Sequence, residues 1–292
     1  MKHVTPYSVF EASAAAPAAL TPEQVEWLNQ CTEDTWKLNP QTGEVDVDGR
    51  FDCSEQGLSE FKGVRFGVVR GCFNCEKNLL TSLVGAPREV RGSFWCRDNQ
   101  LTSLVGAPEK VGEDFDCGSN RLTSLEGAPQ EVGSFYCYNN LLTSLVGAPR
   151  EVGGVFSCDD NHLKSLVGSP QNVKSSFYCE NNHLTSLVGA PQEVGWNFAC
   201  GNNLLTSLEG APRKVGYYFW CDDNPVSEKT LKSIFSRMNG GVSYLKVVES
   251  LWPKIPLEDQ VLLYRPEFKW VGAEEAKKLQ AVGRFNKIKG ML

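Results

Sequence analysis

The chain has 292 residues and a formal net charge of -6, and its charges are unevenly distributed. Residues 225–292 contain 12 Lys or Arg against 7 Asp or Glu, a balance of +5, so residues 1–224 carry -11. An acidic body of this kind argues against nucleic acid as a partner, because binding phosphates requires basic surface. No apolar run approaches the ~20 residues that span a bilayer, so a membrane is not an expected partner either.

The first 50 residues are expected to form a leader and a cap. Residues 1–20 lack the apolar core of a signal peptide and are interpreted as a flexible leader. Thr21, Pro22 and Gln24 supply the N-cap, the first helical residue and its capping partner, so they predict the start of a short helix. A turn-rich hairpin is expected to follow it. Because the first turn of a solenoid would otherwise expose its core, the helix and hairpin of residues 21–50 are predicted to be an N-terminal cap.

Residues 51–226 repeat a unit of about 21 residues. In each unit, Cys lies two residues after Phe, Asn lies three after Cys, and Leu lies five and usually eight after Cys. The unit that begins at Phe135 reads FYCYNNLLTSLVGAPREVGGV. The phenylalanines recur at steps of 22, 21, 21, 20, 21, 21, 21 and 21 residues: Phe51, Phe73, Phe94, Phe115, Phe135, Phe156, Phe177, Phe198 and Phe219.

This period is too short for a pair of helices and indicates a leucine-rich repeat or a related β-solenoid. Phe and Cys alternate with polar residues, so a strand of three to five residues would direct both side chains inward. The Asn amide can satisfy backbone groups in the following turn. We therefore predict a right-handed parallel β-solenoid of about nine turns with little or no helix on its convex side. At roughly 4.8 Å per strand, it would be a rod roughly 40 Å long.

Nine of the eleven cysteines occupy the same repeat position, which predicts an internal column of thiols and not a disulfide scaffold. Such a column suits a reducing compartment, so we expect a cytoplasmic protein. Cys72 and Cys75 form a C-x-x-C sequence, but residues three apart on a strand face opposite sides. No metal site or cofactor is expected there.

The repeated unit F-x-C-x-x-N-x-L-T-S-L-x-G-A-P-x-x-V-G resembles that of bacterial and phage leucine-rich repeat proteins with short, 21-residue repeats. The resemblance extends over eight or nine copies, and the cap sequence TPEQVEWLN also resembles the lead-in of such proteins. It implies a solenoid that recognises proteins and carries no catalytic residues. The first unit departs from the pattern, with Gln56 in place of Asn, as suits an end repeat. The unit from Phe115 is one residue short in its return segment.

Residues 227–292 are predicted to form four helices. Apolar residues spaced three and four apart indicate one helix after Ser227, a second from Tyr244 to Trp252 and two more beyond it. The pattern is interpreted as a C-terminal helical cap, with a separate functional module as the alternative.

No catalytic motif stands out in the sequence, so we expect the protein not to be an enzyme. His162 and His183 follow the repeated Asn in neighbouring units and should lie about 5 Å apart. The favoured interpretation is that they are surface residues at a variable position. A pH-sensitive or metal-binding pair is the alternative, since imidazole is a common metal ligand.

The outward side of the Phe-x-Cys strands is the candidate binding surface. Large aromatic residues recur there every second unit among carboxylates, and exposed Tyr and Trp are typical of binding hot spots. The alternative is that these aromatics only support neighbouring strands. The candidate partner-binding residues are Trp95, Asp98, Asp116, Tyr136, Tyr138, Asp159, Asp160, Tyr178, Glu180, Trp196, Tyr218, Trp220 and Asp222.

The expected function is therefore recognition of a protein partner on an aromatic, acidic sheet face by a monomeric module. The negative charge favours a basic partner. Carbohydrate binding is an alternative, because aromatic platforms beside carboxylates and amides also suit sugar rings. A structural spacer whose C-terminal helices are the active end is a third hypothesis.

Overall fold

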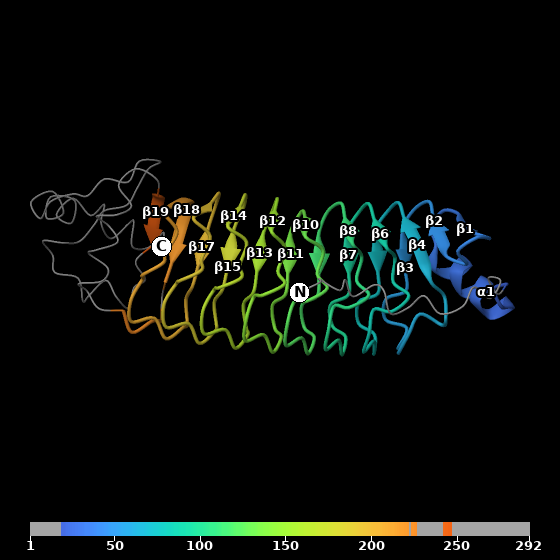
Figure 1. Ribbon diagram of the computed structural model, residues 1–292, viewed down its shortest axis with the longest axis horizontal. Helices are drawn as coiled ribbons and strands as arrows, with labels where there is room; N and C mark the ends of the chain where they lie inside the picture. Colours follow the sequence, from blue (N-terminus) through green and yellow to red (C-terminus); the bar gives the residue numbers. More distant parts are fainter. Residues whose placement is uncertain (1–18, 222, 227–241, 247–292) are drawn as a thin grey trace, which may run out of the picture.

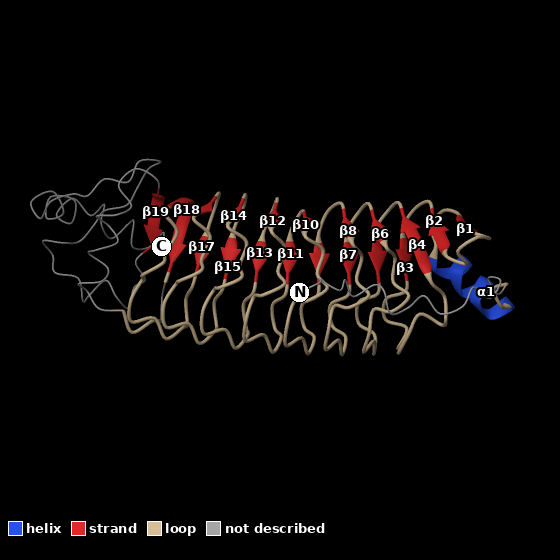
Figure 2. Cartoon of the chain, viewed as in Figure 1, coloured by secondary structure: helices blue, strands red, loops and turns tan. Residues whose placement is uncertain are grey.

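The computed structural model describes residues 19–221, 223–226 and 242–246 (Figure 1). Over these residues the chain winds into an elongated parallel β-solenoid, with a helix at its N-terminal end (Figure 2). Nine strands that carry the repeated Phe delimit eight complete turns, which confirms the predicted solenoid. Each turn contributes short strands to two parallel ladders, joined by loops.

The first ladder, called the Phe ladder below, contains the Phe-x-Cys segments and pairs each Phe with the Phe of the next turn. Its strands are two residues long, shorter than predicted, although the following Cys N–H still bonds to the next turn. The strands are β3 (Phe51–Asp52), β5 (Phe73–Asn74), β7 (Phe94–Trp95), β9 (Phe115–Asp116), β11 (Phe135–Tyr136), β13 (Phe156–Ser157), β15 (Phe177–Tyr178) and β17 (Phe198–Ala199).

The second ladder, called the Val ladder, lies in the return segment, where no strand was predicted. Its valines face the core and the residues before them are mostly exposed. The strands are β4 (Phe66–Val69), β6 (Glu89–Val90), β8 (Lys110–Val111), β10 (Glu131–Val132), β12 (Glu151–Val152), β14 (Asn172–Val173) and β16 (Glu193–Val194). The longer strand β18 (Lys214–Trp220) belongs to both ladders, because its start pairs with β16 and its end with β17.

The core consists of columns of identical side chains. Successive Phe rings of the Phe ladder stack with centroids 5.1–5.8 Å apart and interplanar angles of 6–23°. The nine repeated cysteines are buried, as predicted, and the two Leu columns complete the interior. Buried rings and thiols at one position of every turn explain why the sequence keeps these residue types.

Each repeated Asn satisfies four backbone groups around its turn. Asn140 Nδ2 donates to the carbonyl oxygens of Cys117, Cys137 and Tyr138 at 3.1, 3.2 and 3.1 Å, and its Oδ1 accepts from the Leu122 N–H at 2.9 Å. The same set recurs along the column with few departures. The predicted role of this Asn is confirmed, because these buried backbone groups would otherwise lack partners.

The turn after the second Leu column requires glycine. Gly147 has φ +93°, a region that side chains other than glycine rarely adopt. A Cβ at this position would also lie 2.7 Å from the carbonyl of Leu125 in the preceding turn. The Gly of Gly-Ala-Pro is therefore set both by the backbone conformation and by the close stacking of turns.

The predicted N-terminal cap is present. Helix α1 (Pro22–Cys31) begins with the expected capping box, in which Thr21 Oγ1 accepts from Gln24 N and Gln24 Oε1 accepts from Thr21 N. The hairpin consists of β1 (Trp36–Leu38) and β2 (Val45–Val47), and β2 pairs with β4 as the first rung of the Val ladder. Trp27, which is 2% exposed, packs edge-on against Phe51 with centroids 5.3 Å apart and covers the open end of the core.

The solenoid does not end at residue 226, where the repeat pattern stops. Strand β19 (Val242–Lys246) pairs in parallel with β18. The helix predicted from Tyr244 is therefore wrong over these residues, since chain pairing with the exposed edge of β18 outweighs the local helical spacing. The predicted leader and the remainder of the predicted C-terminal helices lie outside the described residues.

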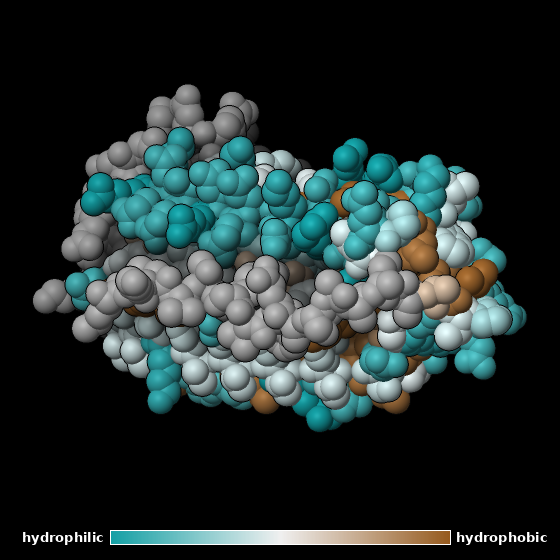
Figure 3. All heavy atoms as spheres, turned by 45° about the vertical axis from the view of Figure 1, so that its right-hand side comes forward, coloured by the Kyte–Doolittle hydropathy of each residue, from teal (hydrophilic) through white to brown (hydrophobic). Residues whose placement is uncertain are grey.

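The described residues include no helix long and apolar enough to cross a membrane. In the face shown in Figure 3, hydrophilic side chains form a band along the upper side. Hydrophobic side chains gather mainly toward the end that carries α1.

Candidate partner-binding face

The candidate face, called the sheet face below, comprises the outward positions of the Phe ladder and of the turn that follows it, namely one residue after each Phe and one and two residues after each Cys. Alternation along the strands directs these side chains away from the core. Tyr136, Tyr178 and Trp220 are partly exposed, as is Trp95. The small residues between them are covered, with Ser157 only 5% exposed and Ala199 0%. The partly exposed aromatic side chains thus alternate along the sheet face with small residues that are buried.

The N-terminal part of the sheet face is neutralised by ion pairs. Arg97 Nε lies 2.8 Å from Glu76 Oε2, and Lys77 Nζ lies 2.6 Å from Glu55 Oε1. Arg50 pairs with Asp52, and its guanidinium carbon also lies 5.7 Å from the ring centroid of Trp95. Trp95, a predicted binding residue, therefore already makes a cation–π contact with a side chain of the same chain.

Tyr138 links neighbouring turns at the centre of the sheet face. Its ring lies over Gly118, where an added Cβ would meet it at 2.5 Å, and its hydroxyl interacts with the Arg97 guanidinium. Asp116 lies beside this pair and accepts from the Gly118 N–H at 2.9 Å. Burial raises the pKa of Asp116 to about 6, although its hydrogen bond and Arg97 act in the opposite direction.

The C-terminal part of the sheet face has carboxylates without basic partners. Asp159 accepts from Ser157 Oγ at 2.7 Å and from the Glu180 N–H at 2.9 Å, while burial raises its pKa. Within the described part of the chain, no ion pair forms at Asp116, Asp159 or Asp160. The structure thus separates the ion-paired carboxylates of the N-terminal turns from Asp159 and Asp160, which form no ion pair within the described residues.

A backbone constraint accounts for two of the predicted acidic residues. Asp98 and Asp160 lie two residues after Cys, where the backbone turns with φ +54° and +52°. Asn139 at the same position has φ +50°, and most turns carry Asn or Asp there, although Glu55, Lys77 and Ser119 adopt the same conformation. Asn and Asp tolerate this left-handed conformation better than other residues with side chains. Their side chains remain exposed.

A cluster of four exposed or partly exposed aromatic residues lies at the C-terminal end of the repeats. Trp196 and Tyr217 have ring centroids 6.1 Å apart, Tyr217 and Tyr218 4.4 Å, and Tyr218 and Trp220 5.4 Å. Trp196 is 61% exposed and precedes the Phe strand by two residues, so it lies at the corner between the two ladders and not on the sheet itself. The predicted residue Asp222 lies outside the described residues.

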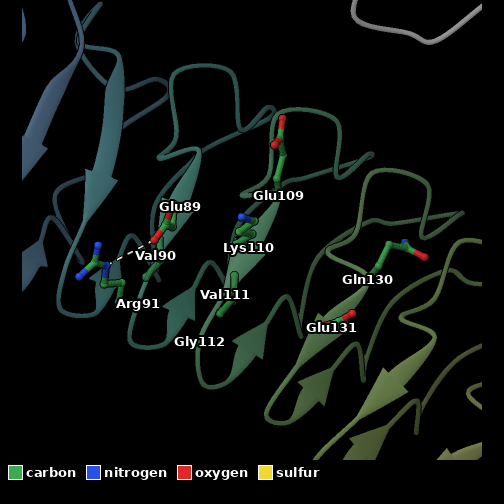
Figure 4. A pocket seen from close by; sticks show the side chains of 9 residues that line it. All are labelled: Glu89, Val90, Arg91, Glu109, Lys110, Val111, Gly112, Gln130 and Glu131. Atoms are coloured by element: carbon green, nitrogen blue, oxygen red, sulfur yellow. Dashed lines mark hydrogen bonds and ion pairs between the residues drawn. The ribbon is translucent and has the colours of Figure 1, made fainter.

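A groove of about 580 Å³ lies on the Val ladder, away from the sheet face (Figure 4). Strands β8 and β10 are adjacent there but are not paired, whereas the Phe ladder is continuous at the same place. No candidate residue was predicted here. The sequence did contain a signal for this break in the Val ladder, namely the unit of 20 residues that begins at Phe115. Only two residues separate Val132 from Phe135, whereas three separate Val111 from Phe115. The groove is lined by Glu89, Val90, Arg91, Glu109, Lys110, Val111, Gly112, Gln130 and Glu131.

Comparison with known proteins gives no assignment: no protein-family model and no curated protein matches the chain. The repeated unit and its position in the solenoid are therefore the basis for any functional argument.

Proposed function

We propose that this chain is a non-enzymatic protein-interaction module of the leucine-rich repeat type, related to the short-repeat proteins of bacteria and phages. The 21-residue unit and its stacked Phe, Asn and Leu columns support this relation. The buried thiol column supports a reducing, cytoplasmic location, because it depends on cysteines that stay unpaired.

The observation that carries the proposed binding is the charge division of the sheet face. The N-terminal carboxylates already have Arg or Lys partners, whereas Asp159 and Asp160 form no ion pair within the described residues. Uncompensated carboxylates beside partly exposed Tyr136 and Tyr178 suit a basic protein segment, which would supply the missing charges and pack its aliphatic stems on the rings. The interface is thus centred on the turns from Tyr136 onward.

A test would measure binding of immobilised Lys- and Arg-rich peptides, with Glu-rich peptides of equal length for comparison. The full chain should bind the basic set, with affinity falling as salt rises. A sheet-face variant with Asp159→Asn and Asp160→Asn should lose at least tenfold in affinity. A matched variant with Glu151→Gln and Glu193→Gln on the Val ladder removes the same charge and should bind normally.

Aromatic removal separates this proposal from its alternatives. Tyr136→Ala with Tyr178→Ala should weaken peptide binding at constant net charge. Equal losses in the Val-ladder variant would mean that only overall charge matters and would contradict a specific face. Binding to a glycan array, lost in the same aromatic variant and unaffected by salt, would instead favour carbohydrate recognition.

A further inference from the structure

His162 and His183 occupy the same position in consecutive turns, one residue after the repeated Asn. The His162 N–H donates to Leu142 O at 2.9 Å, and the His183 N–H donates to Leu163 O at 2.9 Å. The stacked amides of Asn161 and the next turn fix the backbone immediately before each His. Both side chains are exposed, and their ring centroids lie 5.6 Å apart at an interplanar angle of 35°.

This separation fits two imidazoles that share one metal ion. A metal about 2.1 Å from each ligating nitrogen lies about 3.2 Å from each ring centroid, so a tetrahedral angle separates the centroids by about 5.3 Å. The observed distance of 5.6 Å therefore requires only a small side-chain rotation. Because the backbone already holds the two residues side by side, chelation would restrict only the two side chains.

The surroundings make the pair accessible and incomplete. Leu141 and Leu204 occupy the same position in the flanking turns and are 44% and 51% exposed, so no charged side chain lies next to the pair in this column. Among the described residues, no group of three or more His, Cys, Asp or Glu could hold a metal. Water or a ligand from another molecule would have to complete the coordination sphere.

We propose that His162 and His183 form a two-histidine surface site for a divalent transition metal such as Zn²⁺ or Ni²⁺. Imidazole nitrogen suits these metals, whereas Mg²⁺ and Ca²⁺ prefer oxygen ligands. The site is independent of the sheet face, and its open positions could accept a ligand from a second protein.

The site can be tested by titrating Zn²⁺ into the full chain by calorimetry. All samples carry His3→Asn, which leaves only the pair because the chain has three histidines. They also carry Cys72→Ser, because Cys72 is the one cysteine that is not buried. One Zn²⁺ should bind per chain, with no heat from Mg²⁺. His162→Asn or His183→Asn should each weaken binding at least tenfold, because either change removes the chelate.

A gain-of-ligand variant provides the matched control. Leu204→His adds a third imidazole in the next turn, and the affinity for Zn²⁺ should rise at least tenfold. Circular dichroism should be the same for all variants, since His162, His183 and Leu204 are exposed and the other two substitutions are common to every sample. Zn²⁺ binding that survives loss of either histidine, or no Zn²⁺ binding by the intact pair, would overturn the proposal.

Discussion

Asn140 Nδ2 donates to the carbonyl of Cys117, one turn earlier, at 3.1 Å. The hydrogen bond joins neighbouring turns just beyond the end of strand β11 in the Phe ladder. The same side chain accepts from the Leu122 N–H, so one residue satisfies backbone groups in its own turn and in the preceding turn. Its equivalents along the column make the Asn position the main polar connection through the interior.

Replacement of Asn140 with Ala should therefore destabilise the solenoid strongly. Three carbonyls and one N–H would lose their partner at a site that is 5% exposed. Leaving buried polar groups unsatisfied costs about 1–3 kcal/mol each before relaxation, so we expect a loss of about 3 kcal/mol in the free energy of unfolding. Urea denaturation followed by circular dichroism measures it.

The neighbouring Asn139 provides the control for this prediction. Its side chain is exposed and its φ is +50°, so Asn139→Gly should change the free energy of unfolding by less than about 0.5 kcal/mol. Similar losses in the two variants would contradict a special role for the Asn140 position.

The cysteines of the column should be unreactive toward thiol reagents in the folded protein. Ten of the eleven cysteines are buried and only Cys72 is partly exposed. Burial also raises the pKa of thiols such as Cys96 and Cys117, so the reactive thiolate is scarce. A thiol-specific reagent at pH 8 should label about one cysteine quickly, and all eleven in guanidinium.

Cys72→Ser is the matched variant for the labelling experiment. It should abolish the fast phase and leave the ten slow thiols, whose labelling rate should follow unfolding. Fast labelling of several thiols in the native chain would contradict the buried column.

The pH dependence of stability should report on Asp116. Its pKa is about 6 when folded, against a usual value of 3.8, so the folded state binds more protons than the unfolded state between these values. Stability should therefore be greatest below about pH 4 for this group and fall as the pH rises through about 6. The loss for this residue is on the order of 3 kcal/mol.

Asp116→Asn isolates the effect, because the amide oxygen can still accept from the Gly118 N–H. The variant should be more stable than the wild-type chain at pH 7, and the difference should vanish near pH 4. Thermal unfolding across this range measures it. A wild-type advantage at pH 7 would show that the carboxylate is stabilised in the fold.

The inward-facing columns could be predicted from the sequence because of the repeat. Each repeat position occurs nine times, and a residue type that recurs at one position indicates that the position has the same environment in every turn. Phe135, Cys137 and Asn140 all have the predicted roles. The Val ladder was missed because one Val and a preceding polar residue are too short to show a two-residue period. Strand β19 was missed because its pairing depends on the edge of β18, which local spacing does not reveal.

The outward residues were harder to interpret, since a single sequence does not separate binding from support. Trp95 was predicted as a contact residue, yet it lies against Arg50. Asp98 was predicted for its charge, yet its position is also set by a left-handed turn. Trp196 was placed on the sheet face because corner and strand positions are indistinguishable without the register.

Restoring the missing residue before Phe135 should close the gap in the Val ladder. In regular units the Gly after Val donates to the Val of the preceding turn, as Gly112 N does to Val90 O at 2.9 Å. At the short corner Gly133 N donates instead to Glu113 O at 2.6 Å. One glycine inserted after Gly133 should allow the regular hydrogen bond and let β10 pair with β8.

The insertion should raise the free energy of unfolding by about 1 kcal/mol, because added hydrogen bonds outweigh the ordering of one glycine. Hydrogen exchange at the amides of β10 should slow at the same time. The same insertion after Gly154, in a unit that already has 21 residues, should instead destabilise the chain by breaking a regular corner. Equal destabilisation by both insertions would mean that the short unit is accommodated without lost pairing. Stabilisation confined to the first would show that the missing residue alone causes the ladder to break.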